Sequence, residues 1–281
     1  MTPEQADPQV LMEDYIARLA VLEQTGVPGW SAEWHDAARL AGDALVAEGR
    51  VGLEALRLVL DAPTAPADTK WGAFQSLARS KRPDAIMSLV SVLRATTDNR
   101  QRFLWVQGLE LAGPAAAPAL PELIDLLAEK DYVLPSTVKC TLVSIGPAAV
   151  DPLLAVLFVP PMQRRAEAAE ALGRIGDPRA LEPLQAACRD RWPSMRRAAA
   201  TALGDLGDPR ATATWLHLLD DAKPLVRGSA IRALGRIAGR EAIPALTAAA
   251  ADSTRIPGWE PVSTLAKRAI AQIQGRSGII P

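Results

Sequence analysis

An internal repeat of 30 to 33 residues runs through nearly the whole chain of 281 residues. Three stretches align without gaps, namely ALGRIGDPRA at 171–180, ALGDLGDPRA at 202–211 and ALGRIAGREA at 233–242. Upstream, the same pattern of apolar residues followed by turn residues recurs at similar intervals. One anchor leucine marks each copy: Leu45, Leu77, Leu109, Leu142, Leu172, Leu203 and Leu234. A period of this size predicts one helical hairpin per copy, with the hairpins stacked on one another.

Each copy also shows helical periodicity. In MRRAAATALGDL (195–206) the apolar residues recur at i, i+3, i+4 and i+7, which predicts an amphipathic helix. Gly207 and Pro209 then predict the end of this helix and the start of another. The second helix is expected to bury Ala213, Leu216 and Leu219. No segment shows sustained alternation with a period of two, so we expect no sheet.

This pattern resembles that of HEAT-repeat proteins, in the short bacterial variety called HEAT-like or phycobilisome-lyase-type repeats. The residues that carry the resemblance are Arg196…Ala199-Ala200…Ala202-Leu203-Gly204…Leu206-Gly207-Asp208-Pro209, with parallel runs at 165–178 and 227–237. The resemblance is strong over 162–250, fair over 70–160 and weak over 1–60. It implies an all-α fold, a right-handed α-solenoid (superhelix) of about seven hairpins with terminal caps. It also implies that the arginine-bearing helices line the concave face and that the helices after the Asp-Pro turns lie on the convex face.

We expect a single solenoid domain over residues 1–281. Residues 1–29 are interpreted as the N-terminal cap and residues 30–250 as the repeats. Residues 251–281 are expected to hold an insertion loop, a C-terminal cap helix at 262–275 and a tail. Terminal units of a solenoid need polar outer faces, which is the reason for expecting caps.

Composition narrows the class of protein. The net charge is −1, but residues 1–140 carry 13 basic and 19 acidic residues, and residues 141–281 carry 18 and 13. This asymmetry fits electrostatic steering of a partner, or chance variation on a solvated surface. Cys140 and Cys188 are too few and too far apart for a disulfide framework or a zinc site. Without a secretory signal or a run of about 18 uncharged apolar residues, we expect a cytoplasmic protein with no membrane partner.

A basic residue usually stands seven positions before the anchor. The residues in this position are Lys70, Arg102, Arg165, Arg196 and Arg227. Two aspartates, Asp190 and Asp221, each precede the arginine of their own copy by six positions. The basic residues could form a ladder for phosphates. The resemblance favours another reading, in which the arginines and aspartates tie neighbouring repeats together through charge-assisted hydrogen bonds.

Positions six before, two before and two after the anchor share one side of the helix. In this set, large apolar groups and arginines stand where other copies carry small or polar residues. Tryptophan and arginine dominate binding hot spots, so we interpret this side as a binding surface. Its candidate residues, with Trp259 from the insertion loop, are Trp71, Gln75, Arg79, Phe103, Leu104, Gln107, Arg174, Arg197, Arg232, Arg236 and Trp259. Alternatively, Trp71 and Phe103 fill core space in degenerate repeats.

Other aromatic and titratable residues are expected to be structural. Trp105 is expected in the core, with Gly108 providing the space that it needs, and Trp34 is expected to pack behind a helix start capped by Ser31. Cys140 is interpreted as a buried small residue rather than as a reactive thiol.

The sequence contains no motif of a nucleotide-binding loop, a metalloprotease or a thiol redox site, so we expect no catalytic residues, metal or cofactor. We therefore predict a non-catalytic scaffold that binds a partner protein or peptide on the concave surface. Bilin lyase-like chaperones are one alternative, suggested by the resemblance. HEAT-like DNA glycosylases or other nucleic-acid-binding proteins are another, although a net charge near zero disfavours duplex DNA. HEAT-like di-iron hydroxylases need several His-Glu pairs, which this chain lacks.

Overall fold

The computed structural model describes residues 6–24, 31–130 and 133–276, and every regular element in these ranges is helical. The chain divides into two compact units. Unit 1 comprises residues 1–126 and 131–146, and unit 2 comprises residues 127–130 and 147–281. The expectation of a single domain stays a prediction.

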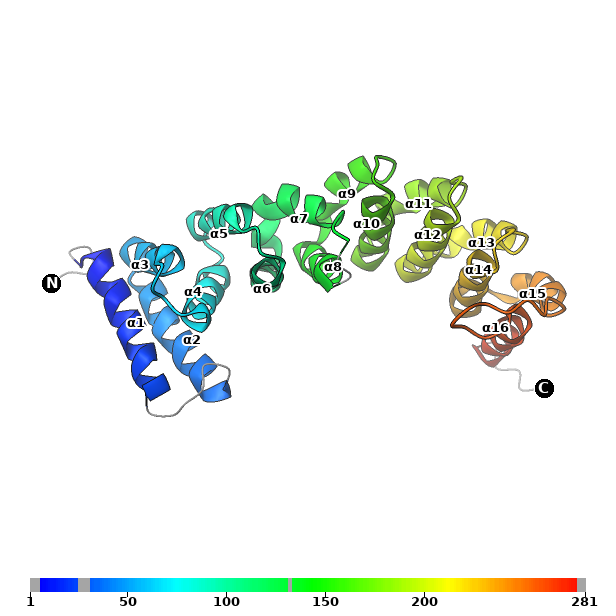
Figure 1. Cartoon of the computed structure of the whole chain (residues 1–281). Helices are drawn as coiled ribbons and strands as arrows, with labels where there is room; N and C mark the ends of the chain where they lie inside the picture. Colours follow the sequence, from blue (N-terminus) through cyan, green and yellow to red (C-terminus); the bar gives the residue numbers. More distant parts are fainter. Residues whose placement is uncertain (1–5, 25–30, 131–132, 277–281) are drawn as a thin grey trace. The chain divides into compact units, whose positions relative to one another are not determined.

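Unit 1 holds the first eight helices of the described chain, labelled α1 to α8 in Figure 1. They are α1 (Pro8–Gln24), α2 (Ala32–Ala47), α3 (Arg50–Asp61), α4 (Ala67–Ser80), α5 (Pro83–Ala95), α6 (Asn99–Glu110), α7 (Leu120–Leu126) and α8 (Val133–Ile145). Helices α2, α4, α6 and α8 pack one on the next, and α3, α5 and α7 form a second layer. We call the first set A helices and the second set B helices.

Unit 2 repeats this arrangement with eight further helices. They are α9 (Val150–Val156), α10 (Met162–Ile175), α11 (Leu181–Ala187), α12 (Pro193–Leu206), α13 (Thr212–Leu218), α14 (Pro224–Ile237), α15 (Ile243–Ala249) and α16 (Val262–Arg276). The A helices α10, α12, α14 and α16 stack in order, and the B helices α9, α11, α13 and α15 each pack on the A helix that follows them. The whole is an α-solenoid with seven helix pairs, α2–α3 to α14–α15, in the described chain.

The repeat pattern places the core correctly. All seven anchor leucines are buried. Gly207 ends α12 in the left-handed conformation, with φ of 77°, as its position before Asp-Pro predicts. At the start of α2, the Ser31 hydroxyl accepts a hydrogen bond from the Trp34 amide at 3.1 Å, and the Trp34 ring is fully buried.

The predicted buried face of the B helix α13 is wrong by one position. Ala213 is exposed and Leu216 and Leu219 are half-buried, whereas Trp215 and Leu218 are buried. The indole nitrogen of Trp215 donates to the Ala200 carbonyl of α12 at 3.2 Å. A short 3-10 turn, Pro209–Ala211, precedes α13. A 3-10 turn has about three residues per turn, so it shifts the phase of the helix that follows.

One stretch, Val133–Val156, has the length and mean hydropathy of a membrane-crossing helix, with 44% of it buried within the structure. The core helices of soluble proteins have the same properties. In this chain the stretch is interrupted, because α8 ends at Ile145 and Gly146 takes a φ of 76° before α9. Leu142 and Val150 on either side of the break are fully buried, so core packing accounts for the apolar composition.

Candidate binding surfaces

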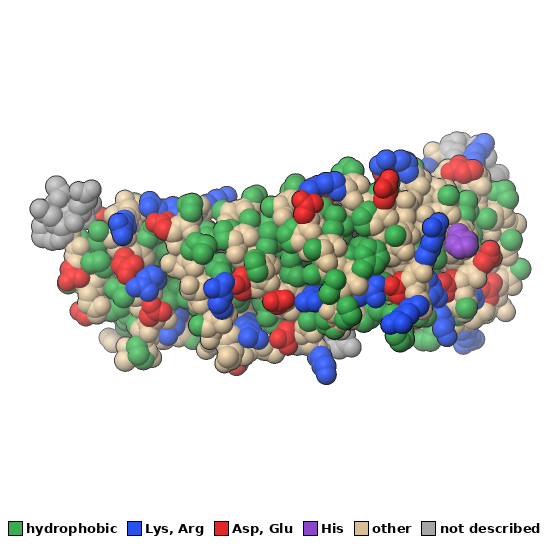
Figure 2. Space-filling model, turned by 90° about the horizontal axis from the view of Figure 1, so that it is seen from above, with side chains coloured by type: hydrophobic (Ala, Val, Ile, Leu, Met, Phe, Trp, Pro, Cys, Tyr) green, Lys and Arg blue, Asp and Glu red, His purple; other side chains and the backbone are tan. Residues whose placement is uncertain are grey.

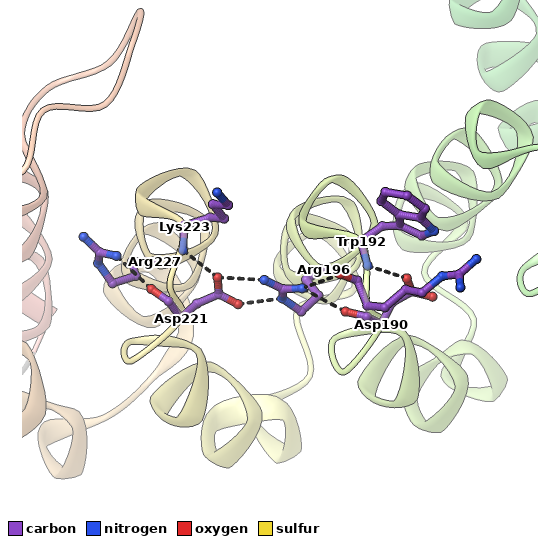
Figure 3. A network of polar contacts seen from close by, with 7 residues as sticks. Asp190, Trp192, Arg196, Asp221, Lys223 and Arg227 are labelled. Carbon is purple, nitrogen blue, oxygen red and sulfur yellow. Dashed lines mark hydrogen bonds and ion pairs between the residues drawn. The ribbon is translucent and has the colours of Figure 1, made fainter.

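Arginine and aspartate side chains connect successive repeats of unit 2 (Figure 3). Arg196 on α12 binds both carboxylate oxygens of Asp221, with its Nε at 2.6 Å and a terminal nitrogen at 2.9 Å. Arg227 on α14 binds one carboxylate oxygen of Asp252, with its Nε at 2.9 Å and a terminal nitrogen at 2.8 Å, and Arg165 on α10 pairs with Asp190. Each arginine thus reaches the aspartate 25 residues further along the chain. We call these three pairs the arginine ladder.

Main-chain carbonyls complete the ladder. Arg196 also donates to the Asp190 carbonyl at 2.9 Å, and Arg227 donates to the Asp221 carbonyl at 2.7 Å. Arg196 therefore contacts only the main-chain carbonyl of Asp190, and the Asp190 carboxylate pairs with Arg165. Asp190 is thus not the carboxylate partner of Arg196, although it precedes Arg196 in the same copy. Six residues separate the two in sequence, but the turn between them points the Asp190 side chain toward the preceding repeat.

Hydrogen bonding holds the ladder aspartates in the charged form. Burial on its own would raise the pKa of Asp221, but the hydrogen bonds from Arg196 and the Lys223 amide outweigh it and lower that pKa. The same balance lowers the pKa of Asp190, through the Trp192 amide and Arg165. The Asp221 side chain is 6% exposed and that of Arg196 16%, so the pair is largely screened from solvent. These groups stabilise the stack and have little freedom to contact a ligand.

In unit 1 the ladder position holds Lys70 on α4 and Arg102 on α6. Arg102 donates to the Thr96 carbonyl at 2.7 Å, as the ladder arginines do to their own turns. Lys70 is half-buried and makes no ion pair with any described residue. A lysine in this position lacks the planar fork that allows an arginine to bind a carboxylate and a carbonyl together.

In unit 2, three of the predicted binding residues line one pocket of about 270 Å³. Arg232 and Arg236 come from α14, and Trp259 comes from the loop between α15 and α16. The other residues that line it are Thr201, Gly204, Asp205, Ser229 and Ala233. We call it the Trp259 pocket. Thr201, Asp205 and Ser229 stand at the same repeat positions as predicted residues, Ser229 at that of Leu104, but none of the three was itself predicted.

The loop that carries Trp259 is fixed at both ends. Asp252 at its start is the last aspartate of the arginine ladder, and the Ser263 amide at its end donates to the Asp252 carbonyl at 2.8 Å. The middle of the loop packs on α14 at Gly228, where an added Cβ would lie 2.8 Å from Ile256 and 3.3 Å from Trp259. Trp259 is therefore placed by tertiary contacts, and its ring is half-buried.

In unit 1, four other predicted residues line a second, larger pocket of about 420 Å³. They are Trp71, Gln75, Arg79 and Gln107, and the remaining lining residues are His35, Asp36, Arg39 and Leu111. We call it the Trp71 pocket. Helices α2, α4 and α6 and the residue that follows α6 provide all of these side chains, so the A helices line both pockets. Asp43 lies 3.9 Å from Arg79 and partly neutralises it.

Trp71 lies near two other rings, stacked with Phe74 and tilted against Trp105, with ring centroids 6.3 Å from each. Phe103 and Leu104 are half-buried and do not line the Trp71 pocket.

Trp105 is in the core, 6% exposed, as expected. Gly108, however, makes room for Phe74 and Trp71, since its Cβ would lie 2.6 Å from the Phe74 ring and 3.1 Å from the Trp71 ring. Three rings share this space, whereas the sequence pattern pointed to Trp105 alone.

The last two predicted arginines lie apart from these pockets. Arg197 lines a third, mostly apolar pocket at the starts of α12 and α14, together with Leu225 and Pro257. Arg174 is exposed near the end of α10.

The described residues contain no group of three or more His, Cys, Asp or Glu side chains that could hold a metal ion. Cys140 is half-buried rather than buried, and burial raises the pKa of the Cys188 thiol to about 12, so Cys188 is protonated at neutral pH.

The sequence pattern of HEAT repeats matches three overlapping segments, residues 120–202, 150–217 and 190–257. This chain contains HEAT repeats. The matched segments cover α7 to α15, where the repeats are most regular. No curated protein matches the sequence.

Several solved structures resemble this HEAT-repeat chain. The karyopherin Kap121p, bound to the extreme C-terminus of the protein phosphatase Cdc14p, aligns with a TM-score of 0.50 and 13% identity, over 96% of this chain and 35% of Kap121p. That likeness shows the α-solenoid fold.

Two enzymes resemble the chain less closely in structure. Human deoxyhypusine hydroxylase in complex with glycerol has a TM-score of 0.40 and 21% identity, over 94% of this chain and 98% of its own. The complex of CpcE and CpcF of phycocyanin lyase from Nostoc sp. PCC7120 has a TM-score of 0.36 and 19% identity, over 79% of this chain and 94% of the chain in the complex.

Proposed function

We propose that this HEAT-repeat protein is a non-catalytic scaffold that binds a partner protein or peptide on the surface of its A helices. The observation that carries the proposal is the Trp259 pocket, which gathers an aromatic ring and two arginines from three predicted positions. Tryptophan and arginine side chains that line a concave site are typical of binding hot spots. Karyopherin Kap121p, which has the same fold, is described as bound to a protein segment, and this also favours a protein partner.

Charge distribution argues for a protein rather than a nucleic acid. On the B-helix side of each unit, basic and acidic side chains are interspersed among hydrophobic ones (Figure 2). In the Trp259 pocket Arg236 is paired with Asp205 at 3.3 Å. A surface for duplex DNA would need unpaired basic residues along a continuous track.

The proposal is tested by capturing partners from lysate of the source cells with the tagged chain. The wild type is compared with Trp259→Ala and with a matched control, Trp192→Ala. Trp192 is also in a turn and also lies under an arginine, but it is 48% exposed and lines neither the Trp259 pocket nor the Trp71 pocket. Mass spectrometry identifies captured proteins, and absorbance at 260 nm and in the visible range reports nucleic acid or pigment.

One protein recovered in near-stoichiometric amount with the wild type and Trp192→Ala, but lost with Trp259→Ala, would support the scaffold. Retention of nucleic acid or a coloured ligand in place of a protein would overturn it and direct attention to glycosylase or bilin assays. A parallel Trp71→Ala variant asks whether the Trp71 pocket takes part.

A further inference from the structure

Arg232 differs from the ladder arginines and from Arg236 in having no polar partner among the described residues. Its guanidinium lies over the Trp259 ring, 4.8 Å from the ring centroid, and it lines the Trp259 pocket. It makes no hydrogen bond or ion pair with any residue in the described part of the chain. By contrast, Arg196, Arg227 and Arg236 all hold carboxylates.

An arginine held on an aromatic face is prepared for binding. The ring attracts the cation and limits its motion, but the five N–H donors lie in the guanidinium plane and stay available. Because the side chain is already oriented, less conformational entropy is lost when a planar acceptor binds. The donors of Arg232 are therefore preoriented, and no residue in the described ranges uses them.

The rest of the pocket fits a single negative charge. Asp205 is neutralised by Arg236, which leaves Arg232 as the uncompensated charge among the lining residues. The hydroxyls of Thr201 and Ser229, 3.4 Å apart, add two hydrogen-bonding groups. A dianion such as phosphate would meet the Asp205 carboxylate with more repulsion than a monoanion would.

We propose that the Trp259 pocket binds a carboxylate of an acidic peptide segment, with Arg232 donating a pair of hydrogen bonds to its two oxygens. The proposal rests on the scaffold function and names the chemistry of the partner. A carboxylate matches the planar fork of arginine better than a single-point acceptor does. The side-chain carboxylate of Glu or Asp and the terminal carboxylate of a chain share this chemistry.

The test uses labelled peptides and fluorescence anisotropy with the full chain. One peptide alternates Glu and Gly and is amidated at its C-terminus. A second replaces every Glu with Gln and is also amidated, and a third is the Gln peptide with a free C-terminus. The Glu peptide and the free C-terminus thus report the two sources of carboxylate separately, and inorganic phosphate is added as a competitor.

Arg232→Gln is expected to weaken binding of the carboxylate peptide by about tenfold or more, because a charge-assisted pair of hydrogen bonds is lost. Arg232→Lys should also weaken binding, since it keeps the charge but loses the fork. The matched control is Arg191→Gln, which removes an arginine from the face of the exposed Trp192, where the guanidinium lies 5.1 Å from the ring centroid. It should change binding by less than about twofold. Circular dichroism and melting temperature check that each variant is folded.

If Arg232→Gln and Arg191→Gln weaken peptide binding equally, the peptide is attracted by overall charge and the proposal is overturned. The proposal is also overturned if the amidated Gln peptide binds as tightly as the Glu peptide, or if neither carboxylate peptide binds. Complete displacement of the bound peptide by equimolar phosphate would overturn it as well. If the cellular partner is lost with Trp259→Ala but retained with Arg232→Gln and unaffected by the Glu peptide, the scaffold stands and the carboxylate proposal fails. If both variants still bind the cellular partner, the scaffold proposal itself is contradicted.

Discussion

The two units hold their A helices together by different means. In unit 2 small residues allow close contact, and the arginine ladder joins each repeat to the next. An added Cβ at Gly173 would lie 2.4 Å from the main-chain oxygen of Ala202, so the backbones of α10 and α12 meet directly. In unit 1 the rings of Trp71, Phe74 and Trp105 fill the space between α4 and α6. The ladder position of α4 holds Lys70, which makes no ion pair with any residue that the structure describes.

This difference shows what a regular repeat requires. A ladder pair forms only when successive repeats place an arginine and an aspartate at a fixed separation, and small residues at the helix contact keep that separation constant. Aromatic packing tolerates irregular spacing, because large rings adapt to the space that neighbouring repeats leave. In unit 2 the Trp259 pocket contains Arg232, which is held against the Trp259 ring. In unit 1 the Trp71 pocket is larger and has more varied side chains.

The largest expected loss of stability comes from breaking a pair of the arginine ladder. Arg196→Ala should lower the free energy of unfolding by ~3 kcal/mol, because the Asp221 carboxylate stays buried without its partner. Lys70→Ala, at the same repeat position in unit 1, should change it by less than ~0.5 kcal/mol. Urea unfolding gives the loss, and hydrogen exchange locates it. Similar losses in the two variants would show that the ladder position matters equally in both units.

A second comparison concerns the helix contacts. Gly173→Ala should cost ~2 kcal/mol, because its new methyl group meets main-chain atoms that cannot move aside. Gly108→Ala in unit 1 should cost less, since the atoms in its way belong to the Phe74 ring. Gly204→Ala should stay within ~1 kcal/mol of wild type, because its Cβ meets only the Ala233 methyl at 3.2 Å and alanine favours the helix. Thermal melting of the three variants checks this order, and a reversed order would contradict the close-contact argument.

The units should also differ in their response to acid. The pKa values of Asp190, Asp221 and Asp252 are lowered by hydrogen bonds that they accept in the folded state. Below the unfolded-state pKa of about 3.9, the unfolded chain binds more protons, so their stabilisation is full above this pH and is lost as the pH falls further. Hydrogen exchange at pH 5 and near pH 3.5 should show unit 2 losing protection. Asp221→Asn should make this pH dependence shallower, and an unchanged dependence would exclude Asp221 as a cause.

The smallest effect at neutral pH should come from Tyr15 of α1. Burial raises the pKa of its phenol, and the positive charge of Arg79 only partly opposes this. The contribution of Tyr15 is therefore full below the unfolded-state pKa of about 10 and is lost as the pH rises above it. Tyr15→Phe should change the melting temperature little at pH 7, because the hydroxyl has no hydrogen-bond partner in the described part of the chain.

Above pH 10, the melting temperature of the Tyr15→Phe variant should fall less than that of the wild type. Parallel curves for the two proteins would contradict this assignment.

The sequence alone determined the helical hairpin, its period, the anchor leucines and the repeat positions that share one side of each A helix. These features depend on residues three or four apart, whose relation is set by helix geometry. The same spacing placed Trp71, Gln75, Arg79 and Gln107 around one pocket.

Only the tertiary structure decided which repeats and loops meet. Arg196 binds the aspartate 25 residues ahead rather than the one six residues behind, because the turns point the carboxylates toward the previous repeat. The 3-10 turn before α13 moved its buried face to Trp215. The long loop brought Trp259 over Arg232 through contacts at Gly228 and Asp252. These outcomes depend on the rotation from one hairpin to the next and on loop packing, which a periodic pattern along a single chain does not encode.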